Sequence, residues 1–226
     1  MKEPSCPRCG GTVQPPGLWS SGWGCALHGT VLPQQPVVQP TVEVVADVVR
    51  RSQVPVWLPW PLPHAWLVTG VSWAGDERTG ARAVAVAASG PAPLGGMGEL
   101  LLVAEEPGIG LGARYAGMPG PDPGAVPDGR PAAKVDAAGH PTALWCAAGD
   151  DSCASYVGEA LGSWLYVLLW PESAGALLLE GLQLADARDL GHEIELLPVG
   201  ALSPRLAARP GQRAAAGSGP GAGTTP

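Results

Sequence analysis

The sequence predicts an α+β protein: a small N-terminal ribbon followed by a mostly antiparallel sheet domain with a few short helices. Two features lead to this expectation. Cysteines and a histidine stand in two closely spaced pairs near the amino terminus, Cys6-x2-Cys9 and Cys25-x2-His28. Farther along, short apolar runs follow one another with turn-forming residues between them, which is typical of hairpins. The expected units are a ribbon (1–31), a proline-rich linker (32–40), an α+β domain (41–206) and a disordered tail (207–226).

The two ligand pairs have the chemistry of a structural zinc site. Zn²⁺ is held tetrahedrally by thiolate and imidazole ligands, and a C-x2-C pair offers two thiolates from one tight turn. Pro7 stiffens the first turn, and Gly10 permits the backbone conformation with which the chain leaves it. No ligand position remains for water or substrate, so the ion is expected to be structural. Its predicted ligands are Cys6, Cys9, Cys25 and His28.

The same residues admit other interpretations. A disulfide or a chance arrangement would also bring cysteines together, whereas a redox CxxC would require a flanking βαβ pattern that the sequence lacks. With three of five cysteines assigned to the metal, the remaining thiols suit a reducing, cytoplasmic compartment. Cys146 lies in an apolar run and is expected to pack as a small hydrophobic residue, and Cys153 follows two aspartates that would oppose thiolate formation.

Composition excludes several classes of function. The 226 residues, 46% of them hydrophobic, are enough for one domain with a core and a small appendage. No apolar stretch reaches the length of a membrane span, and the amino terminus lacks the apolar segment of a secretion signal. The net charge is −7, and the ribbon has only Lys2 and Arg8 against Glu3. Nucleic-acid binding, which depends on neutralising phosphates, is therefore disfavoured.

The first elements of the domain are a helix and a proline-rich strap. Residues 41–52 place four valines on one face, with Thr41 as N-cap, and this spacing favours a helix although β-branched valines also suit a strand. Prolines at four positions of Val54–Trp66 exclude a central strand, so this segment is expected to form a strap or an edge segment that cannot be zipped into a sheet. In an extended segment Trp57 and Trp60 point in different directions. Either both rings lie over the core of their own domain as a lid, or one ring stays partly exposed as an anchor for a partner.

Strands are expected to make up most of the chain after the strap. The runs 65–73, 81–89 and 98–106 read as strands, the first two joined as a hairpin. Little periodicity marks 108–141. The remaining expectations are a strand at 142–148, a short helix at 152–162, a buried strand at 163–170, a segment at 175–191 that suits either helix or strand, and a last strand at 193–199.

No catalytic or nucleotide-binding motif is complete. The glycine-rich stretch after Glu106 fails the G-x-G-x-x-G spacing, and two adjacent glutamates would repel phosphate. An enzyme site near the Gly95–Gly117 loops would need converging side chains, for which the candidates are Glu105, Glu106, Arg114 and His140.

Several stretches together resemble an uncharacterised family of actinobacterial cytosolic proteins, a domain of unknown function. They are "PSCPRCGG", "QVPVWLPWPLP", "GPAPLGGMGELLLVAEEPGIGLGARYAG", "GEALG" and "ELLPVGALSPRL". The resemblance runs from about Pro4 to Leu206 and puts the four predicted ligands at the ribbon positions of the family. Some of these proteins carry a phosphotransacetylase label, which no residue set in this chain supports.

The resulting expectation is a non-enzymatic, cytoplasmic zinc-ribbon protein that binds or regulates another protein, in part through Trp57 or Trp60. The alternatives are a transferase-like small-molecule enzyme with its site near Gly95–Gly117, and a ribbon that binds nucleic acid.

Overall fold

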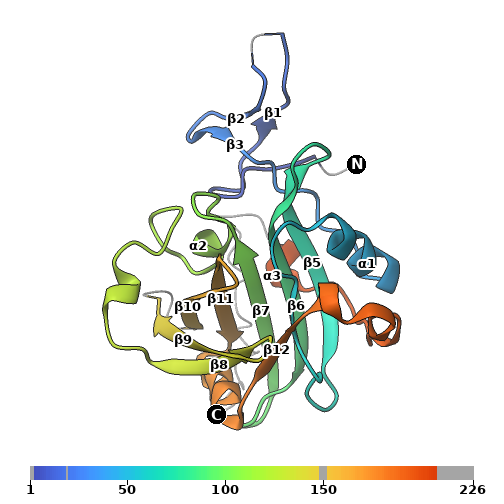
Figure 1. Ribbon diagram of the computed structural model, residues 1–226, viewed down its shortest axis with the longest axis vertical. Coiled ribbons are helices and arrows are strands. Elements are labelled where there is room, and N and C mark those ends of the chain that lie inside the picture. The colour runs from blue at the N-terminus through green and yellow to red at the C-terminus, as the bar shows by residue number, and fades with distance from the viewer. Residues whose placement is uncertain (1–2, 19, 148–151, 208–226) are drawn as a thin grey trace, which may run out of the picture.

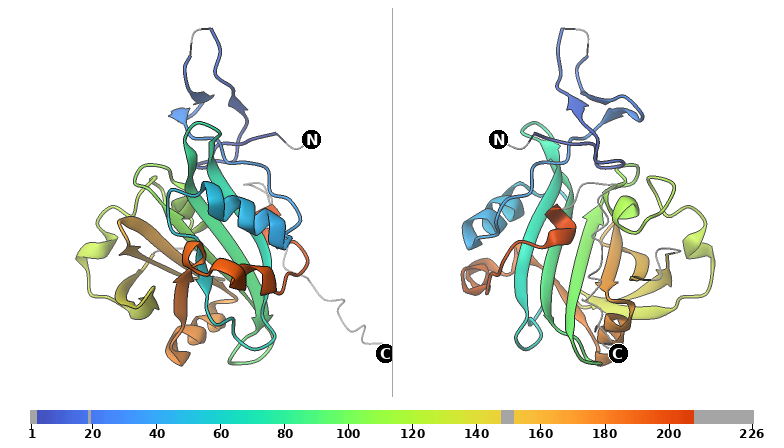
Figure 2. Two further views of the ribbon diagram at one scale, coloured as in Figure 1. Left: turned by 45° about the vertical axis from the view of Figure 1, so that its right-hand side comes forward. Right: turned by 180° about the vertical axis from the view of Figure 1, so that it is seen from behind.

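The computed structural model describes residues 3–18, 20–147 and 152–207 and contains two sheets (Figure 1). The smaller sheet has three strands in the order β1-β2-β3: β1 (Val13–Gln14), β2 (Trp23–Cys25) and β3 (Gly29–Val31). It stands above one end of the larger sheet in all three views (Figures 1 and 2). The predicted tail lies outside the described residues apart from Ala207, which ends the helix α3 (Pro204–Ala207).

The larger sheet has nine strands, and every neighbouring pair is antiparallel except β12 with β8. The mostly antiparallel α+β architecture expected from the sequence is therefore present. In spatial order the strands are β4 (Trp57–Pro59), β12 (Gln183–Asp186), β8 (Ala133–Ala137), β9 (His140–Cys146), β10 (Ala154–Ala160), β11 (Ser163–Trp170), β7 (Met97–Glu105), β6 (Gly80–Pro91) and β5 (Leu67–Asp76).

The centre of this sheet is buried on both faces. In β6, Val84 and Val86 belong to one hydrophobic cluster, while Ala83 and Ala85, which point the other way, belong to a second. Covering both faces explains why β6, β7 and β11 read as continuous apolar runs rather than as alternating patterns. These three strands, and the β5–β6 hairpin, were predicted correctly.

Helices cover the two faces. The predicted helix is confirmed as α1 (Val42–Arg51), where the Thr41 hydroxyl accepts a hydrogen bond from Val44 N at 3.3 Å and Val45 and Val48 are buried. The buried side chains of α1 belong to the first hydrophobic cluster, and those of the short helix α2 (Leu111–Tyr115) belong to the second, so the two helices cover opposite faces of the sheet. The 3₁₀ helices are η1 (Val126–Asp128), η2 (Glu172–Glu180), η3 (Ala187–Asp189) and η4 (Gly191–Leu196).

Two predicted elements were wrong. The expected helix at 152–162 is strand β10, because Leu161 and Gly162 both have positive φ (50° and 75°) and form a tight turn that pairs β10 with β11. The expected strand at 193–199 is mainly the 3₁₀ helix η4, with only Val199 in a bridge to Val68. The ambiguous segment 175–191 contains 3₁₀ helix on either side of strand β12. The weakly patterned 108–141 contains α2, η1, β8 and the start of β9.

The proline-rich strap forms the first edge of the sheet. Trp57, Leu58 and Pro59 pair with β12, so the expectation that the strap cannot be zipped into a sheet was wrong. Pairing is possible because β4 is an edge strand, which needs a partner on one side only. Trp57 is 1% exposed and belongs to the core, whereas Trp60 is partly buried against it. Of the two tryptophans, only Trp60 has surface to offer a partner.

The segment expected to be a linker is bound on both sides. The backbone of Gln34 exchanges hydrogen bonds with Ser5 of the ribbon at 2.7 and 2.9 Å. Gln35 N donates to Trp73 O at 2.8 Å, and Gly75 N donates to Pro33 O at 2.9 Å. The extended 33–35 stretch thus ties the ribbon to β5. Among the described residues, no helix is long and apolar enough to cross a membrane.

Candidate metal centre

Two matching turns carry the four predicted ligands. In the first, Gly10 N donates to Cys6 O at 2.7 Å, and Cys6 N donates to Gly11 O at 2.8 Å. The second turn joins β2 to β3, where Cys25 pairs with Gly29. Gly10 and Gly29 each follow the second ligand of a pair and have φ values of 67° and 65°, which favour glycine. The same local geometry is therefore built twice, once with a thiol and once with an imidazole as the second ligand.

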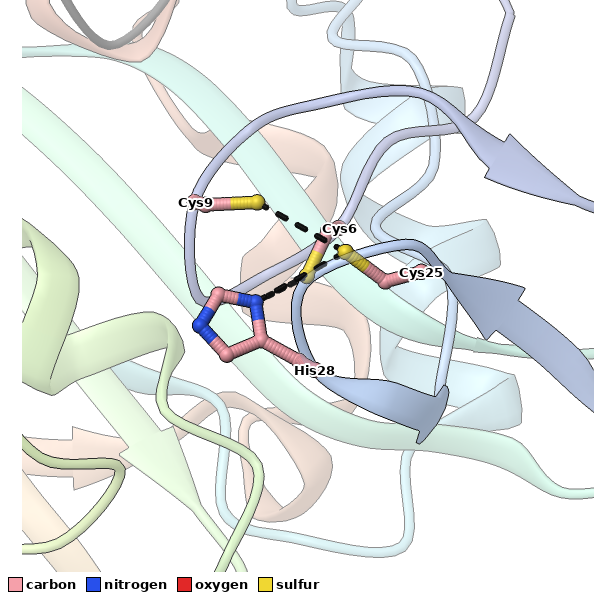
Figure 3. A group of neighbouring side chains, drawn as sticks. All are labelled: Cys6, Cys9, Cys25 and His28. Carbon is pink, nitrogen blue, oxygen red and sulfur yellow. Dashed lines mark hydrogen bonds between the residues drawn. The ribbon is translucent and has the colours of Figure 1, made fainter.

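The ligand atoms lie at the spacing of a tetrahedral metal site (Figure 3). Cys6 Sγ and Cys25 Sγ are each 3.6 Å from His28 Nδ1, and Cys9 Sγ is 3.7 Å from Cys25 Sγ. All four ligand atoms lie within 4.8 Å of one another. With Zn–S near 2.3 Å and Zn–N near 2.0–2.1 Å, a tetrahedron has S–S edges of about 3.8 Å and S–N edges of about 3.6 Å. The three given distances agree with these edges, so the group could hold a metal ion.

The surroundings of the sulfurs differ. Cys6 is fully buried, and burial raises the pKa of its thiol despite hydrogen bonds from the backbone of Cys9 and Arg8. Burial also works against the Cys25 thiolate, but hydrogen bonds from the backbone of Leu27 and His28 and from the His28 ring lower the pKa of Cys25. Backbone donors therefore converge on one sulfur in each turn, as a thiolate ligand requires. A bound cation would favour the thiolate form of the buried Cys6 as well.

The set is closed in chemical terms. Three thiols and one imidazole supply four ligands, so a tetrahedral ion would have no position left for water or substrate. His28 faces the sulfurs through Nδ1 (Figure 3), which leaves Nε2 on the far side of the ring from the cluster. The arrangement suits an ion that holds the turns together, and no step of catalysis follows from it.

The ribbon is fixed to the sheet domain next to this cluster. Arg8, which lies between the first two ligands, donates through Nη2 to Gly108 O and through Nε to Ile109 O at 3.3 Å. On the other side, Arg78 at the β5–β6 turn donates to Ser21 O at 3.1 Å. The glycine-rich loop after β7 is therefore a binding surface for the ribbon itself.

The residues that an enzyme site would need do not converge. Glu105 is fully buried beneath α2, and Glu106 forms an ion pair with Arg82. Arg114 lines a cavity beside the ribbon, and His140 lines a separate depression on the outside of β9. The expectation for Cys146 was wrong: it ends β9 with its side chain exposed, and the next residue, Ala147, is the one that packs in the second hydrophobic cluster. Cys153 is half-buried.

A buried polar group beneath α2 was not anticipated. Glu105 Oε2 accepts from Leu111 N at 2.7 Å, so the carboxylate caps the amino terminus of α2. Its other oxygen and the Tyr166 hydroxyl are buried without a well-formed hydrogen bond among the described residues. Burial raises the pKa of Glu105 to about 7, against hydrogen bonds from the backbone of Gly112 and Leu111. The sequence signal was a glutamate at the end of an apolar strand, which ordinarily indicates a solvated residue.

A small sheet with a Cys/His cluster, placed before a nine-stranded, mostly antiparallel sheet, defines an α+β protein with a candidate metal centre. The family of unknown function DUF6758 matches residues 1–206, and the chain belongs to this family. The match covers both sheets, which therefore form one family unit. No curated protein and no solved structure is detectably similar to the chain.

Proposed function

We propose that this chain is a non-enzymatic cytoplasmic protein whose zinc ribbon presents a surface to another protein. The observation that carries the proposal is the closed Cys3His set, because a site with four protein ligands stabilises structure and leaves no coordination position for chemistry. Zinc is the proposed ion, since a tetrahedral set rich in thiolates suits Zn²⁺ and the ligand spacing agrees with Zn–S and Zn–N bond lengths.

The exposed side chains of the ribbon support protein binding. Leu18 in the β1–β2 hairpin is 97% exposed, and Leu27 in the second ligand turn is 79% exposed. This hairpin stands away from the sheet domain (Figures 1 and 2). An exposed leucine on the projecting hairpin and another on the second ligand turn are suited to contact an apolar patch on a partner.

The charges of the ribbon weigh against nucleic acid. Arg8 is the only lysine or arginine in residues 3–31, and its guanidinium is bound to the carbonyls of Gly108 and Ile109. No cation of this segment is therefore available for phosphate, which is the main source of affinity in nucleic-acid complexes.

Quantitative affinity capture from an extract of the native host tests the proposal. The bait is the full-length, zinc-loaded chain, compared with a Leu18→Glu, Leu27→Glu double variant. Leu179→Glu is the matched control, because Leu179 is an equally exposed leucine (87%) on η2 in the sheet domain. Metal content by mass spectrometry verifies that every variant keeps its ribbon.

We expect a specific protein to be recovered with the wild-type chain and with Leu179→Glu, and to be lost with the double variant. Equal recovery in all three would place the partner surface elsewhere, and Trp60→Ala would then be the next variant. Recovery of nucleic acid in place of protein would contradict the proposal.

A further inference from the structure

A cavity of about 220 Å³ lies between the ribbon and the sheet domain. Its walls come from segments far apart in the chain: Gly10–Thr12 after the first ligand turn, the 34–37 stretch, α2 and the end of α3. Small-molecule sites occur preferentially where separate structural units meet, although this cavity is below the about 300 Å³ at which drug-sized ligands begin. It therefore suits a small compound.

Among the described residues, one cationic side chain lines the cavity, Arg114 of α2. Its Nη2 donates to Gln34 Oε1 at 2.8 Å, and its guanidinium lies 4.8 Å from the centre of the Tyr115 ring. Gln34 is only 5% exposed and is itself held, since its Nε2 donates to Ser72 Oγ at 2.8 Å and to Tyr115 Oη at 3.3 Å. A buried network thus fixes the orientation of this guanidinium before any ligand is present.

Arg114 differs from five other arginines of the sheet domain, which form ion pairs with carboxylates. Within the described residues, no carboxylate pairs with it, and the acceptor it has is a neutral amide. A half-buried, pre-oriented guanidinium with unused donors matches the planar, bidentate geometry of a carboxylate. The arginines that do pair with carboxylates are Arg50, Arg51, Arg82, Arg188 and Arg205.

The remaining walls narrow the class of ligand. Val37 and Leu206 pack with the second hydrophobic cluster and give the cavity an apolar side. Glu3 is an exposed carboxylate at the same cavity and would repel a ligand with two negative charges. We propose that the cavity between the first ligand turn and α2 binds a small monocarboxylate with an apolar body, and that Arg114 holds its carboxylate. This inference does not depend on the proposed function.

The inference can be tested by titrating the full-length, zinc-loaded protein with benzoate and with isobutyrate. Binding is monitored by NMR through the resonances of the backbone amides and the arginine Nε–Hε groups. Benzamide and isobutyramide are the matched neutral probes, since they keep the shape and remove the charge. We expect saturable shifts of the Arg114 Nε–Hε resonance and of the Gly10–Thr12 amides with at least one acid, and none with its amide.

Arg114→Gln should weaken binding of that acid by at least about tenfold, the loss expected for a hydrogen-bonded charge. Arg130→Gln, which removes an exposed arginine, should bind as the wild type does. Equal binding of acid and amide, saturation with the shifts confined to other regions, or no saturable binding would each overturn the inference. If Arg114→Gln does not fold, the comparison of each acid with its amide on the wild-type protein tests the inference by itself.

Discussion

The two sheets of this protein are stabilised by different means. In the ribbon the buried cluster consists of Cys6, Cys25 and Val31, so two of its three members are candidate metal ligands. The nine-stranded sheet instead has apolar side chains buried on both faces. A small ribbon cannot bury enough apolar surface to offset its conformational entropy, and a metal ion held by the cluster would supply what the core lacks. The comparison implies that the two regions can be destabilised separately.

Removal of the metal should have the largest effect, and only on the ribbon. Replacing Cys6 and Cys9 together by serine removes two thiolates from the set, and structural zinc contributes on the order of 10 kcal/mol to small zinc-dependent folds. We expect loss of one zinc per chain and rapid proteolysis within residues 3–31, while the melting transition of the sheet domain remains. Metal analysis and limited proteolysis measure this. Full metal content in the variant, or simultaneous unfolding of both regions, would refute the separation.

Removal of a core side chain should have the opposite pattern. Trp57→Ala should lower the free energy of unfolding of the sheet domain by about 3–5 kcal/mol, since this ring is 1% exposed, and leave zinc bound. Trp60→Ala should cost less because Trp60 is only partly buried. Urea denaturation with parallel metal analysis distinguishes the two. Equal losses for both variants would show that the strap acts as one lid.

The buried Glu105 should make the sheet domain more stable in mild acid. Its folded-state pKa is raised to about 7 from an ordinary value of 4.5, so its contribution is fully present below pH 4.5 and is lost as the pH rises through 7. Tyr166 and Asp122 are the titratable groups that face it. Over this window the change is about 3 kcal/mol.

Glu105→Gln, which keeps an acceptor for Leu111 N, should remove that dependence. Urea denaturation of both proteins at pH 5.5, 7 and 8.5 at a fixed zinc concentration measures the difference. Parallel pH profiles for the wild type and the variant would show that Glu105 does not titrate in this range.

The contact between the regions should have the smallest effect. Arg8→Ala removes the bonds to Gly108 and Ile109 but no ligand, so zinc content should be unchanged and stability reduced by about 1–2 kcal/mol. Hydrogen exchange should become faster in residues 106–117. Arg78→Ala, which loses only the bond to Ser21 O, serves as the comparison. If hydrogen exchange in Arg8→Ala became faster only in the ribbon, the order of the loop at residues 106–117 would not depend on its contact with the ribbon.

The sequence allowed the Cys/His cluster and the central strands to be predicted because both depend on local patterns. Ligand spacing and the two glycines define the turns, and the apolar runs of β6, β7 and β11 exceed what a loop would contain. The hairpin at Leu161 was missed because a leucine with positive φ gives no sequence signal. The cavity at Arg114 and the burial of Glu105 depend on contacts between distant segments, which periodicity does not reveal.

The order of the strands limits how the molecule can associate with itself. Strands β4 and β5 are at opposite ends of the nine-stranded sheet, yet only the short segment after Pro59 separates them in the chain. Eight strand spacings would span about 38 Å in a flat sheet. The eight Cα steps from Pro59 to Leu67 reach at most about 29 Å. The sheet must therefore curl, and its two edges approach each other.

Neither edge then offers a free template for a further strand. In the segment Pro55–Pro59, the residues whose backbone groups point away from β12 are Pro55, Trp57 and Pro59, and the two prolines lack an amide proton. Along β5, the 33–35 stretch covers one end, and Pro198 and Gly200 hydrogen-bond Val68 at the other, each at 2.9 Å. Edge-to-edge polymerisation is blocked at both sides, so concentrated solutions of this glycine- and alanine-rich chain should stay free of β-aggregates while the sheet remains folded.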